Sequence, residues 1–162
     1  EGGGEMIEHV RWDKTTYNVL PYKFEAGTPN YIGSYAFSKA LEYLQSLGIE
    51  DIAKHEEELV EYIEERLAGL EHVKIYAAGQ KKAGAVSFNV YRVDGGLIHP
   101  FDVGVLLDRQ GVAVRTGHHC AEPLIEHLGV PGTLRASVGL YNTKEDIDKM
   151  VAALERAIMM LE

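Results

Sequence analysis

The residues best suited to chemistry lie at positions 115–120, which read Arg-Thr-Gly-His-His-Cys. Cys120 is the only cysteine in the sequence, with a histidine beside it and Arg115 five positions earlier. Cationic neighbours of this kind favour the thiolate, which is the nucleophilic form of cysteine. Because the segment contains a glycine and follows an expected strand, we predict that Cys120 lies on an accessible loop and is reactive.

Two alternatives for Cys120 stay open from its residue type. Free cysteine is among the most frequently buried residues, so a structural thiol in the core is the first alternative. A metal site is the second, because histidine and cysteine both ligate zinc. Side chains of neighbouring residues diverge in an extended loop and no second cysteine is present, so we expect no metal here.

A second candidate residue lies on an expected strand at residues 133–138. Apolar residues alternate there with Thr133, Arg135 and Ser137, which places these three on the face opposite the core. From such a position, the guanidinium of Arg135 can bind a carboxylate through two parallel hydrogen bonds. The alternative is a surface ion pair, which contributes little to stability.

A third candidate is the expected start of a helix at Gly27, Thr28 and Pro29. Thr28 is predicted to be the N-cap, with Pro29 at the first helical position. The hydroxyl and unpaired N–H groups of a helix N-terminus also suit a phosphate. The sequence alone does not separate a simple cap from an anion site.

The elements that must position these residues alternate between helices and strands. Apolar spacing and capping signals predict helices at 29–47, 51–68, 100–111, 123–128 and from Thr143 to Leu161, and strands at 73–75, 86–90, 112–114 and 133–138. In the second helix, Glu64 and Glu65 are expected to face water. Residues 6–22 are expected to form short extended pieces. This alternation predicts an α/β fold with a small mixed sheet covered by helices.

Composition narrows the class of protein. The 162 residues are 46% hydrophobic, which is enough for one globular domain, and their formal net charge is −9. An acidic chain without a run of Lys or Arg argues against a nucleic-acid partner. No apolar run approaches the roughly 20 residues that span a bilayer, and a single cysteine fits a reducing compartment. We therefore expect a soluble, cytoplasmic protein without a membrane partner.

Four segments together resemble a known family: residues 24–30 (FEAGTPN), 101–104 (FDVG), 115–124 (RTGHHCAEPL) and 135–137 (RAS). They are similar to the C-terminal portion of SufS-type (group II) cysteine desulfurases, which are pyridoxal 5'-phosphate (PLP) enzymes of the class V aminotransferase family. The segment at 115–120 is specific to the SufS-like branch, because the other desulfurase branch carries its cysteine in a longer, serine-rich loop.

The resemblance implies a domain organisation. Residues 1–22 would be the tail of a large PLP domain or a linker, and residues 23–162 the C-terminal small domain of a fold-type I PLP enzyme, which has an α+β-like fold. The full-length enzyme would be a homodimer. In that family the cofactor lysine follows a histidine, and this sequence contains no His-Lys pair. We therefore expect that this segment does not bind PLP covalently and is inactive as a desulfurase when isolated.

The resemblance also implies roles for residues. Cys120 would take sulfur from L-cysteine, forming a persulfide and releasing L-alanine. Arg135 would bind the substrate carboxylate, and Arg115 would order the cysteine loop or contact the substrate. Gly27 and Thr28 would reach the PLP phosphate of the partner subunit. A sulfur-acceptor protein would then collect the persulfide for iron–sulfur cluster assembly.

Two other functions share these features. A selenocysteine lyase-type class V PLP enzyme would use most of the same scaffold. A stand-alone sulfur-carrier or protein-interaction module would use Cys120 without any cofactor. The coding sequence upstream discriminates between them, because only an enzyme requires a PLP domain with its lysine.

Overall fold

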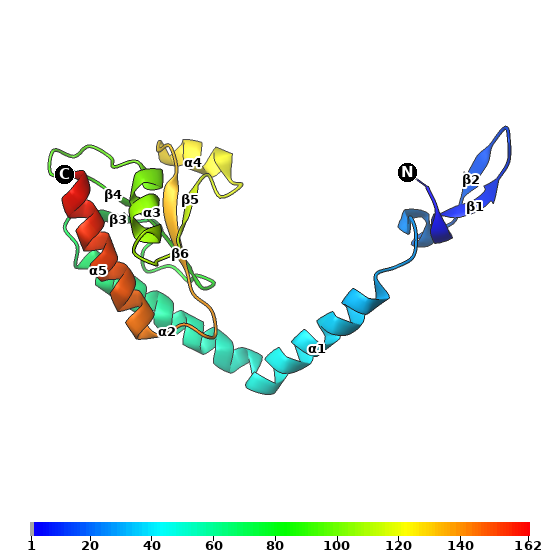
Figure 1. Cartoon of the computed structure of the whole chain (residues 1–162), viewed down its shortest axis with the longest axis horizontal. Coiled ribbons are helices and arrows are strands. Elements are labelled where there is room, and N and C mark those ends of the chain that lie inside the picture. Colours follow the sequence, from blue (N-terminus) through cyan, green and yellow to red (C-terminus); the bar gives the residue numbers. More distant parts are fainter. Residues whose placement is uncertain (1) are drawn as a thin grey trace. The chain divides into compact units, whose positions relative to one another are not determined.

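The computed structural model describes residues 2–162, which divide into two compact units. The first unit ends at Leu47 and the second comprises Gly48–Glu162 (Figure 1). The boundary that the resemblance implied after residue 22 falls inside the first unit, and it stays a prediction about the longer protein.

The first unit is a small hairpin followed by a long helix. Its elements in order are the 3-10 turn η1 (Gly4–Met6), β1 (Ile7–Val10), β2 (Thr15–Tyr17), the 3-10 turn η2 (Tyr22–Phe24) and α1 (Tyr31–Leu47). β1 and β2 pair antiparallel, with Val10 opposite Thr15. The extended pieces expected in residues 6–22 are therefore the two arms of one hairpin.

Helix α1 starts two residues later than predicted, and its N-cap is Asn30. The Asn30 Oδ1 accepts a hydrogen bond from the N–H of Gly33 at 2.9 Å, which is the capping geometry predicted for Thr28. The assignment of Thr28 as N-cap is therefore wrong. Asparagine ranks at least as high as threonine at this position, and Pro29 then precedes the helix instead of opening it.

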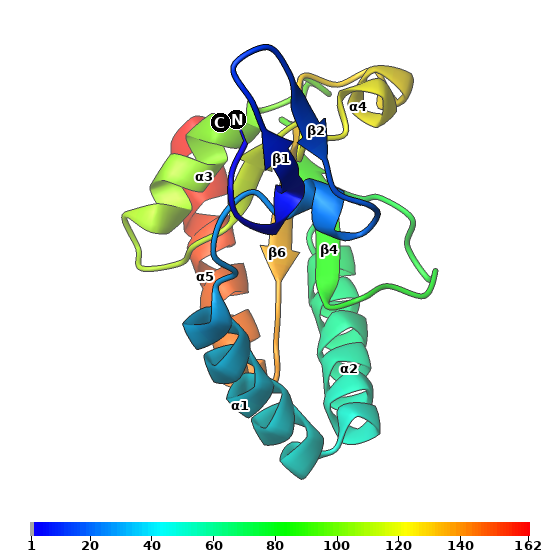
Figure 2. The ribbon, with the colours of Figure 1, turned by 90° about the vertical axis from the view of Figure 1, so that its right-hand side faces the viewer.

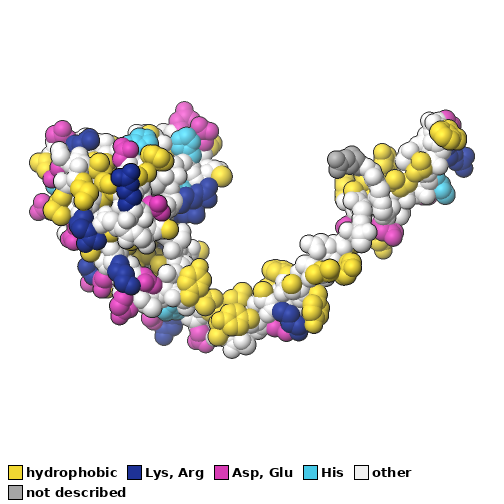
Figure 3. All heavy atoms as spheres, viewed as in Figure 1, with side chains coloured by type: hydrophobic (Ala, Val, Ile, Leu, Met, Phe, Trp, Pro, Cys, Tyr) yellow, Lys and Arg dark blue, Asp and Glu magenta, His cyan; other side chains and the backbone are white. Residues whose placement is uncertain are grey.

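The surface of α1 is apolar on several sides. Large exposed hydrophobic residues along it are Tyr31, Ile32, Tyr35, Phe37, Leu41, Tyr43 and Leu47. Figure 3 shows hydrophobic side chains gathered along this helix. A helix with apolar residues around its circumference is typical of a helix buried inside a larger protein. None of the helices in residues 2–162 is long and apolar enough to cross a membrane.

The second unit contains a four-stranded sheet in the order β3 (Val73–Ile75), β4 (Ala85–Val90), β6 (Thr133–Ser137), β5 (Arg115–Gly117). All three of its pairings are antiparallel, so the expectation of a mixed sheet is wrong in this detail. The reason is the position of β6, which lies between β4 and β5. β4 and β5 run in the same direction, because each is antiparallel to β6, but they are not neighbours.

Four helices accompany the sheet: α2 (Ile49–Ala68), α3 (Pro100–Asp108), α4 (Glu122–Leu128) and α5 (Lys144–Leu161). Figures 1 and 2 show α2 and α5 beside the sheet. The core joins inward residues of β4 and β6, among them Phe88 and Leu134, to buried residues of α2, α3 and α5. The α/β fold class with helices over a small sheet is confirmed, as is the capping signal at Thr143, where Thr143 and Asp146 form a capping box at the start of α5.

The strand predicted at 112–114 lies three residues further along the chain, at Arg115–Gly117. Val112 and Val114 pack against the core without forming a strand, so their apolar alternation gave a false signal. The shift matters for the site, because it places Arg115 within the sheet.

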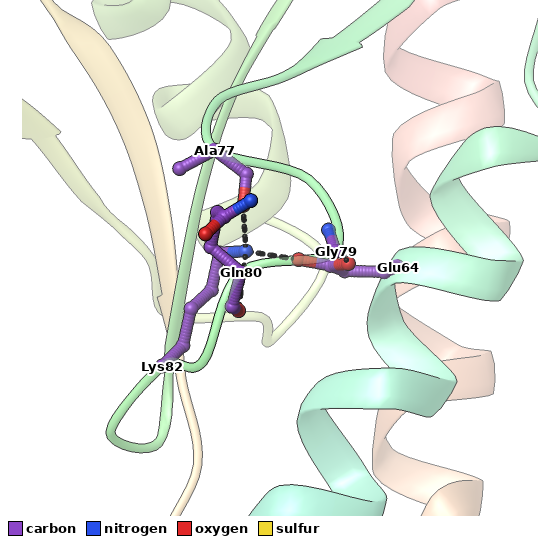
Figure 4. A network of polar contacts seen from close by, with 5 residues as sticks. All are labelled: Glu64, Ala77, Gly79, Gln80 and Lys82. Atoms are coloured by element: carbon purple, nitrogen blue, oxygen red, sulfur yellow. Dashed lines mark hydrogen bonds and ion pairs between the residues drawn. The ribbon is translucent and has the colours of Figure 1, made fainter.

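Glu64 does not face water as predicted. It forms an ion pair with Lys82 and accepts a hydrogen bond from the N–H of Gly79 at 2.9 Å (Figure 4). Lys82 also donates to the carbonyl of Ala77. Burial raises the pKa of Glu64, but these contacts more than offset it and hold the pKa below 4.5. These contacts of Glu64 hold the loop between β3 and β4 against α2.

Candidate functional site

The turn that carries Cys120 follows directly after β5. The N–H of Ala121 donates to the carbonyl of His118 at 2.9 Å, which closes a β-turn with His119 and Cys120 at its centre. Cys120 is exposed, so its predicted accessibility is confirmed and the alternative of a thiol buried in the core is excluded.

Both central residues of this turn have positive φ, 56° at His119 and 58° at Cys120. Positive φ at both central positions is the pattern of a type I′ turn, which usually carries Asn-Gly. For residues with a side chain, the left-handed conformation costs roughly 1–2 kcal/mol each. Strain of this kind persists only where the surroundings hold it, and it clusters at functional sites.

Arg115 provides a donor to the sulfur. Its Nη2 lies 3.5 Å from Cys120 Sγ, so the guanidinium can donate a hydrogen bond to it. The contact places a positive charge next to the thiol that is the candidate nucleophile. Arg115, five positions before Cys120 in the sequence, is thus also its neighbour in space, and it belongs to strand β5.

Arg135 lies directly opposite Arg115 in the β5–β6 pair. Its strand neighbours Leu134 and Ala136 are buried in the core, so Arg135 is on the opposite face, as predicted. Its Nε is buried without a hydrogen-bond partner among residues 2–162. Two guanidiniums on one face, one with an unused buried donor, form a site suited to an anionic group such as a carboxylate.

His119 is the histidine that the sequence counted among the cationic neighbours of Cys120, and its contacts with β6 were not predicted. Its Nε2 lies 3.1 Å from the carbonyl oxygen of Thr133 and 2.9 Å from the Thr133 hydroxyl. A carbonyl only accepts, so Nε2 carries the proton, and the buried Nδ1 has no partner among residues 2–162. The one available signal was the predicted placement of Thr133 on the same strand face as Arg135.

The pKa of His119 is lowered from 6.5. Burial is the largest cause, and the positive charges of Arg135 and Arg115, with a smaller effect of His118, act in the same direction. The hydrogen bond to Thr133 opposes them only in part. At neutral pH the imidazole is therefore uncharged, which fits its role as a donor through Nε2 alone. The expectation of a cationic histidine beside Cys120 is wrong for this residue, because burial and the two arginines disfavour its charged form.

Gly27 and Thr28 lie in the first unit, on the stretch that leads into α1. Gly27 has φ 115°, and a Cβ built on it would meet only open space within 4 Å. Thr28 is exposed. A Cβ on Gly4 would approach the Gly27 nitrogen at 2.7 Å, so the close contact between these two glycines fixes this stretch against the hairpin.

The geometry restricts the chemistry of the site. Within the part of the chain that the structure describes, no three His, Cys, Asp or Glu residues are grouped so that they could hold a metal ion. The sheet brings Cys120, Arg115 and Arg135 together, whereas Gly27 and Thr28 belong to the other unit. An exposed sulfur beside the Arg115 guanidinium, with Arg135 opposite Arg115 in the sheet, can act as a nucleophile toward a substrate that carries a carboxylate.

Comparison with known proteins gives consistent matches. Residues 1–150 match the family model described as aminotransferase class-V. The chain is 47% identical over 156 residues to a probable cysteine desulfurase of Halalkalibacterium halodurans, covering 96% of this chain and 37% of that protein. It thus spans little more than a third of the length of this curated relative.

Two solved structures are also similar. One is the cysteine desulfurase CsdA (S-sulfonic acid) of Escherichia coli, with a TM-score of 0.86 and 36% identity, covering 100% of this chain and 39% of that one. The other is the apo cysteine desulfurase of Thermococcus onnurineus, with a TM-score of 0.82 and 38% identity, covering 98% and 39%.

Proposed function

Because the chain belongs to the class V aminotransferase family, we propose that it is the C-terminal segment of a SufS-type, PLP-dependent cysteine desulfurase. The substrate would be L-cysteine, and Cys120 would receive its sulfur. The observation that carries the proposal is the placement of an exposed Cys120 beside Arg115, with Arg135 opposite Arg115 on the same sheet face. The nucleophile Cys120 and the carboxylate-binding residue Arg135 would then both be positioned by the same β-sheet.

The residues of this chain fit only one end of the cofactor. The open backbone at Gly27 and the exposed hydroxyl of Thr28 suit a phosphate group, although Thr28 is not the helix cap. No lysine occurs in residues 115–137, which include Cys120 and both strands of the site. The lysine that holds PLP would therefore come from the rest of the protein. Bound PLP would supply the electron sink for reaction at the substrate carbon.

The residues described here would carry the sulfur transfer. Arg135 would hold the substrate carboxylate, and Arg115 would donate a hydrogen bond to the sulfur of Cys120. The Cys120 thiolate would attack the substrate sulfur, so that a sulfur–sulfur bond forms and the carbon–sulfur bond breaks. The electron pair of that bond stays with carbon, which gains a proton and becomes the methyl group of L-alanine. Cys120 is left as a persulfide.

The longer protein would have further properties of the SufS-type family. We propose that residues 1–22 are the tail of a large PLP domain or a linker from it to a small domain of residues 23–162, and that two chains form a homodimer in the cytoplasm. Gly27 and Thr28 of one subunit would then contact the PLP phosphate of the other. A sulfur-acceptor protein would take the persulfide for iron–sulfur cluster assembly.

The test uses the longer protein and the 162-residue chain side by side. Each is incubated with PLP and L-cysteine, then assayed for L-alanine and, by mass spectrometry, for one sulfur atom added to Cys120. We expect both products only with the longer protein, and no persulfide in its Cys120→Ser variant. Alanine from the 162-residue chain would refute its inactivity, and sulfur on another cysteine would refute the role of Cys120.

Selenocysteine serves as the comparison substrate. A much higher kcat/KM with selenocysteine than with cysteine would favour a selenocysteine lyase-type enzyme. A coding sequence without a PLP domain, together with sulfur carried on Cys120 alone, would favour a stand-alone sulfur carrier.

A further inference from the structure

We propose that His119 is a positioning residue, whose imidazole holds the strained turn so that Cys120 Sγ stays beside Arg115. The importance of this placement for sulfur transfer rests on the proposed function. The placement itself is tested without it, on the 162-residue chain.

The turn does not hold itself in this conformation. Two consecutive residues with side chains have positive φ, and the turn contains a single backbone hydrogen bond, from Ala121 to His118. Contacts outside the turn must therefore select the left-handed conformation. His119 provides such contacts, because its Nε2 reaches both the carbonyl and the hydroxyl of Thr133.

Thr133 is a firm anchor for this contact. Thr133 is only 1% exposed, and it is paired with Gly117 of β5 in the sheet. The preceding carbonyl, that of Gly132, accepts a hydrogen bond at 3.0 Å from Nδ2 of Asn89, which is fully buried. A Cβ on Gly132 would approach the Gly117 Cα at 3.0 Å, so the two strands lie too close for side chains at this point. The imidazole thus connects the turn to a rigid part of the sheet.

The position of Cys120 depends on the contact between His119 and Thr133, because Cys120 is the residue that follows His119 in the turn. The same turn sets where Sγ points, and Sγ lies 3.5 Å from Arg115 Nη2. Arg115 belongs to β5, whose partner strand β6 contains Thr133. One sheet therefore holds both the cation and the anchor of the turn, and His119 connects the sulfur to that sheet.

The experiment measures how fast iodoacetamide alkylates Cys120, the only thiol in the chain, at one fixed neutral pH. His119→Gly removes the hydrogen bonds to Thr133, although glycine adopts positive φ more readily than histidine does. We expect the alkylation rate to fall several-fold and the Ala121 amide to exchange faster. His119→Gln, whose amide can also donate, should restore part of the rate. His118→Ala is the matched control, because the ring of His118 lies 3.9 Å from a Glu122 carboxylate oxygen and, among residues 2–162, forms no hydrogen bond or ion pair with β6.

A double-mutant cycle separates positioning from general loosening. If His119 acts by holding Sγ near Arg115, His119→Gly should not slow alkylation further in an Arg115→Ala background. An unchanged or faster rate in His119→Gly, or equal slowing in both backgrounds, would overturn the proposal. Failure of the longer protein to make alanine would instead count against the proposed function, since alkylation does not require it.

Discussion

Arg115 and Arg135 are directly opposite each other in the β5–β6 pair, with both side chains on the face away from the core. Like charges at such positions, whose Cβ atoms are about 5 Å apart, destabilise a sheet. These 162 residues therefore contain a repulsive pair next to their single cysteine. The arrangement is explained if an anion lies between the two guanidiniums during function.

The first prediction concerns this repulsion. In the 162-residue chain, Arg135→Gln should leave the thermal midpoint unchanged or raise it, because one of two like charges is removed. The gain should be larger at low salt, where charges are less screened. Thermal unfolding followed by circular dichroism at two salt concentrations measures this. A clear fall in the midpoint at low salt would show that Arg135 stabilises the fold instead.

In the longer protein, the same substitution should act on substrate binding. The expected result is a loss of kcat/KM for L-cysteine of about one to two orders of magnitude, mainly through a higher KM, because a charged hydrogen-bond pair is lost. Ser137→Ala, on the same strand face but exposed, is the matched control. Equal kinetics for wild type and Arg135→Gln would remove Arg135 from the substrate site.

The pKa of His119 predicts how stability depends on pH. Because its folded pKa lies below 6.5, the unfolded chain binds more protons between the two values, and stability falls as the pH drops through 6.5 toward the folded pKa. Glu64 and Asp146 have lowered pKa values, so their contributions are lost only as the pH falls below about 4.5. Urea unfolding at pH 7.5 and pH 5 should show a smaller difference in His119→Gln than in wild type. An identical difference would contradict this assignment.

Gly104 predicts a steric effect of helix α3 on the site. A Cβ at this position would lie 2.5 Å from the Thr116 methyl carbon, so Gly104→Ala must push α3 away from β5. We expect a loss of roughly 1–3 kcal/mol, reduced by the higher helix propensity of alanine. Thr116→Ser removes that methyl group and should restore most of the stability in the double variant. Urea unfolding measures all four proteins, and an additive double variant would exclude the clash.

The contact between Glu64 and Lys82 predicts the stability of the loop between β3 and β4. Glu64→Gln should lower the free energy of unfolding by about 1–3 kcal/mol, since it leaves the largely buried ammonium of Lys82 without its charge partner. Limited proteolysis should then cut within residues 77–82. Glu65→Gln, one residue along and exposed, is the control. Equal proteolysis of the two variants would show that the ion pair does not hold the loop.

Much of the fold could be predicted from the sequence because most signals were local. The capping signal at Thr143 and the apolar spacing that predicts α2 are local patterns. In the structure, α5 has its capping box, and α2 buries Leu59, Ile63 and Leu67. The prediction of a strand at 112–114 was wrong because Val112 and Val114 pack against the core from an irregular segment. Local alternation of apolar residues does not distinguish such a segment from a strand. The antiparallel order depends on β6 lying between two strands, which is a long-range property.

The features of the candidate site likewise divide into those that local sequence signals predicted and those that they did not. Exposure of Cys120 and the face of Arg135 follow from a glycine-containing loop and strand parity, so sequence reasoning found them. The clamp of His119 on Thr133 requires positive φ at two residues that rarely adopt it, and no residue type in the segment signals this. The loss of the cap at Thr28 reflects competition with Asn30, two residues away.

The exposed thiol of Cys120 also allows the 162-residue chain to be labelled at one position. A nitroxide or a fluorophore would attach at position 120 without any engineered mutation, because the sequence contains no competing thiol. Spectra from such a probe would follow the local tumbling of the bend in real time while candidate acceptor proteins or small carboxylates are titrated in.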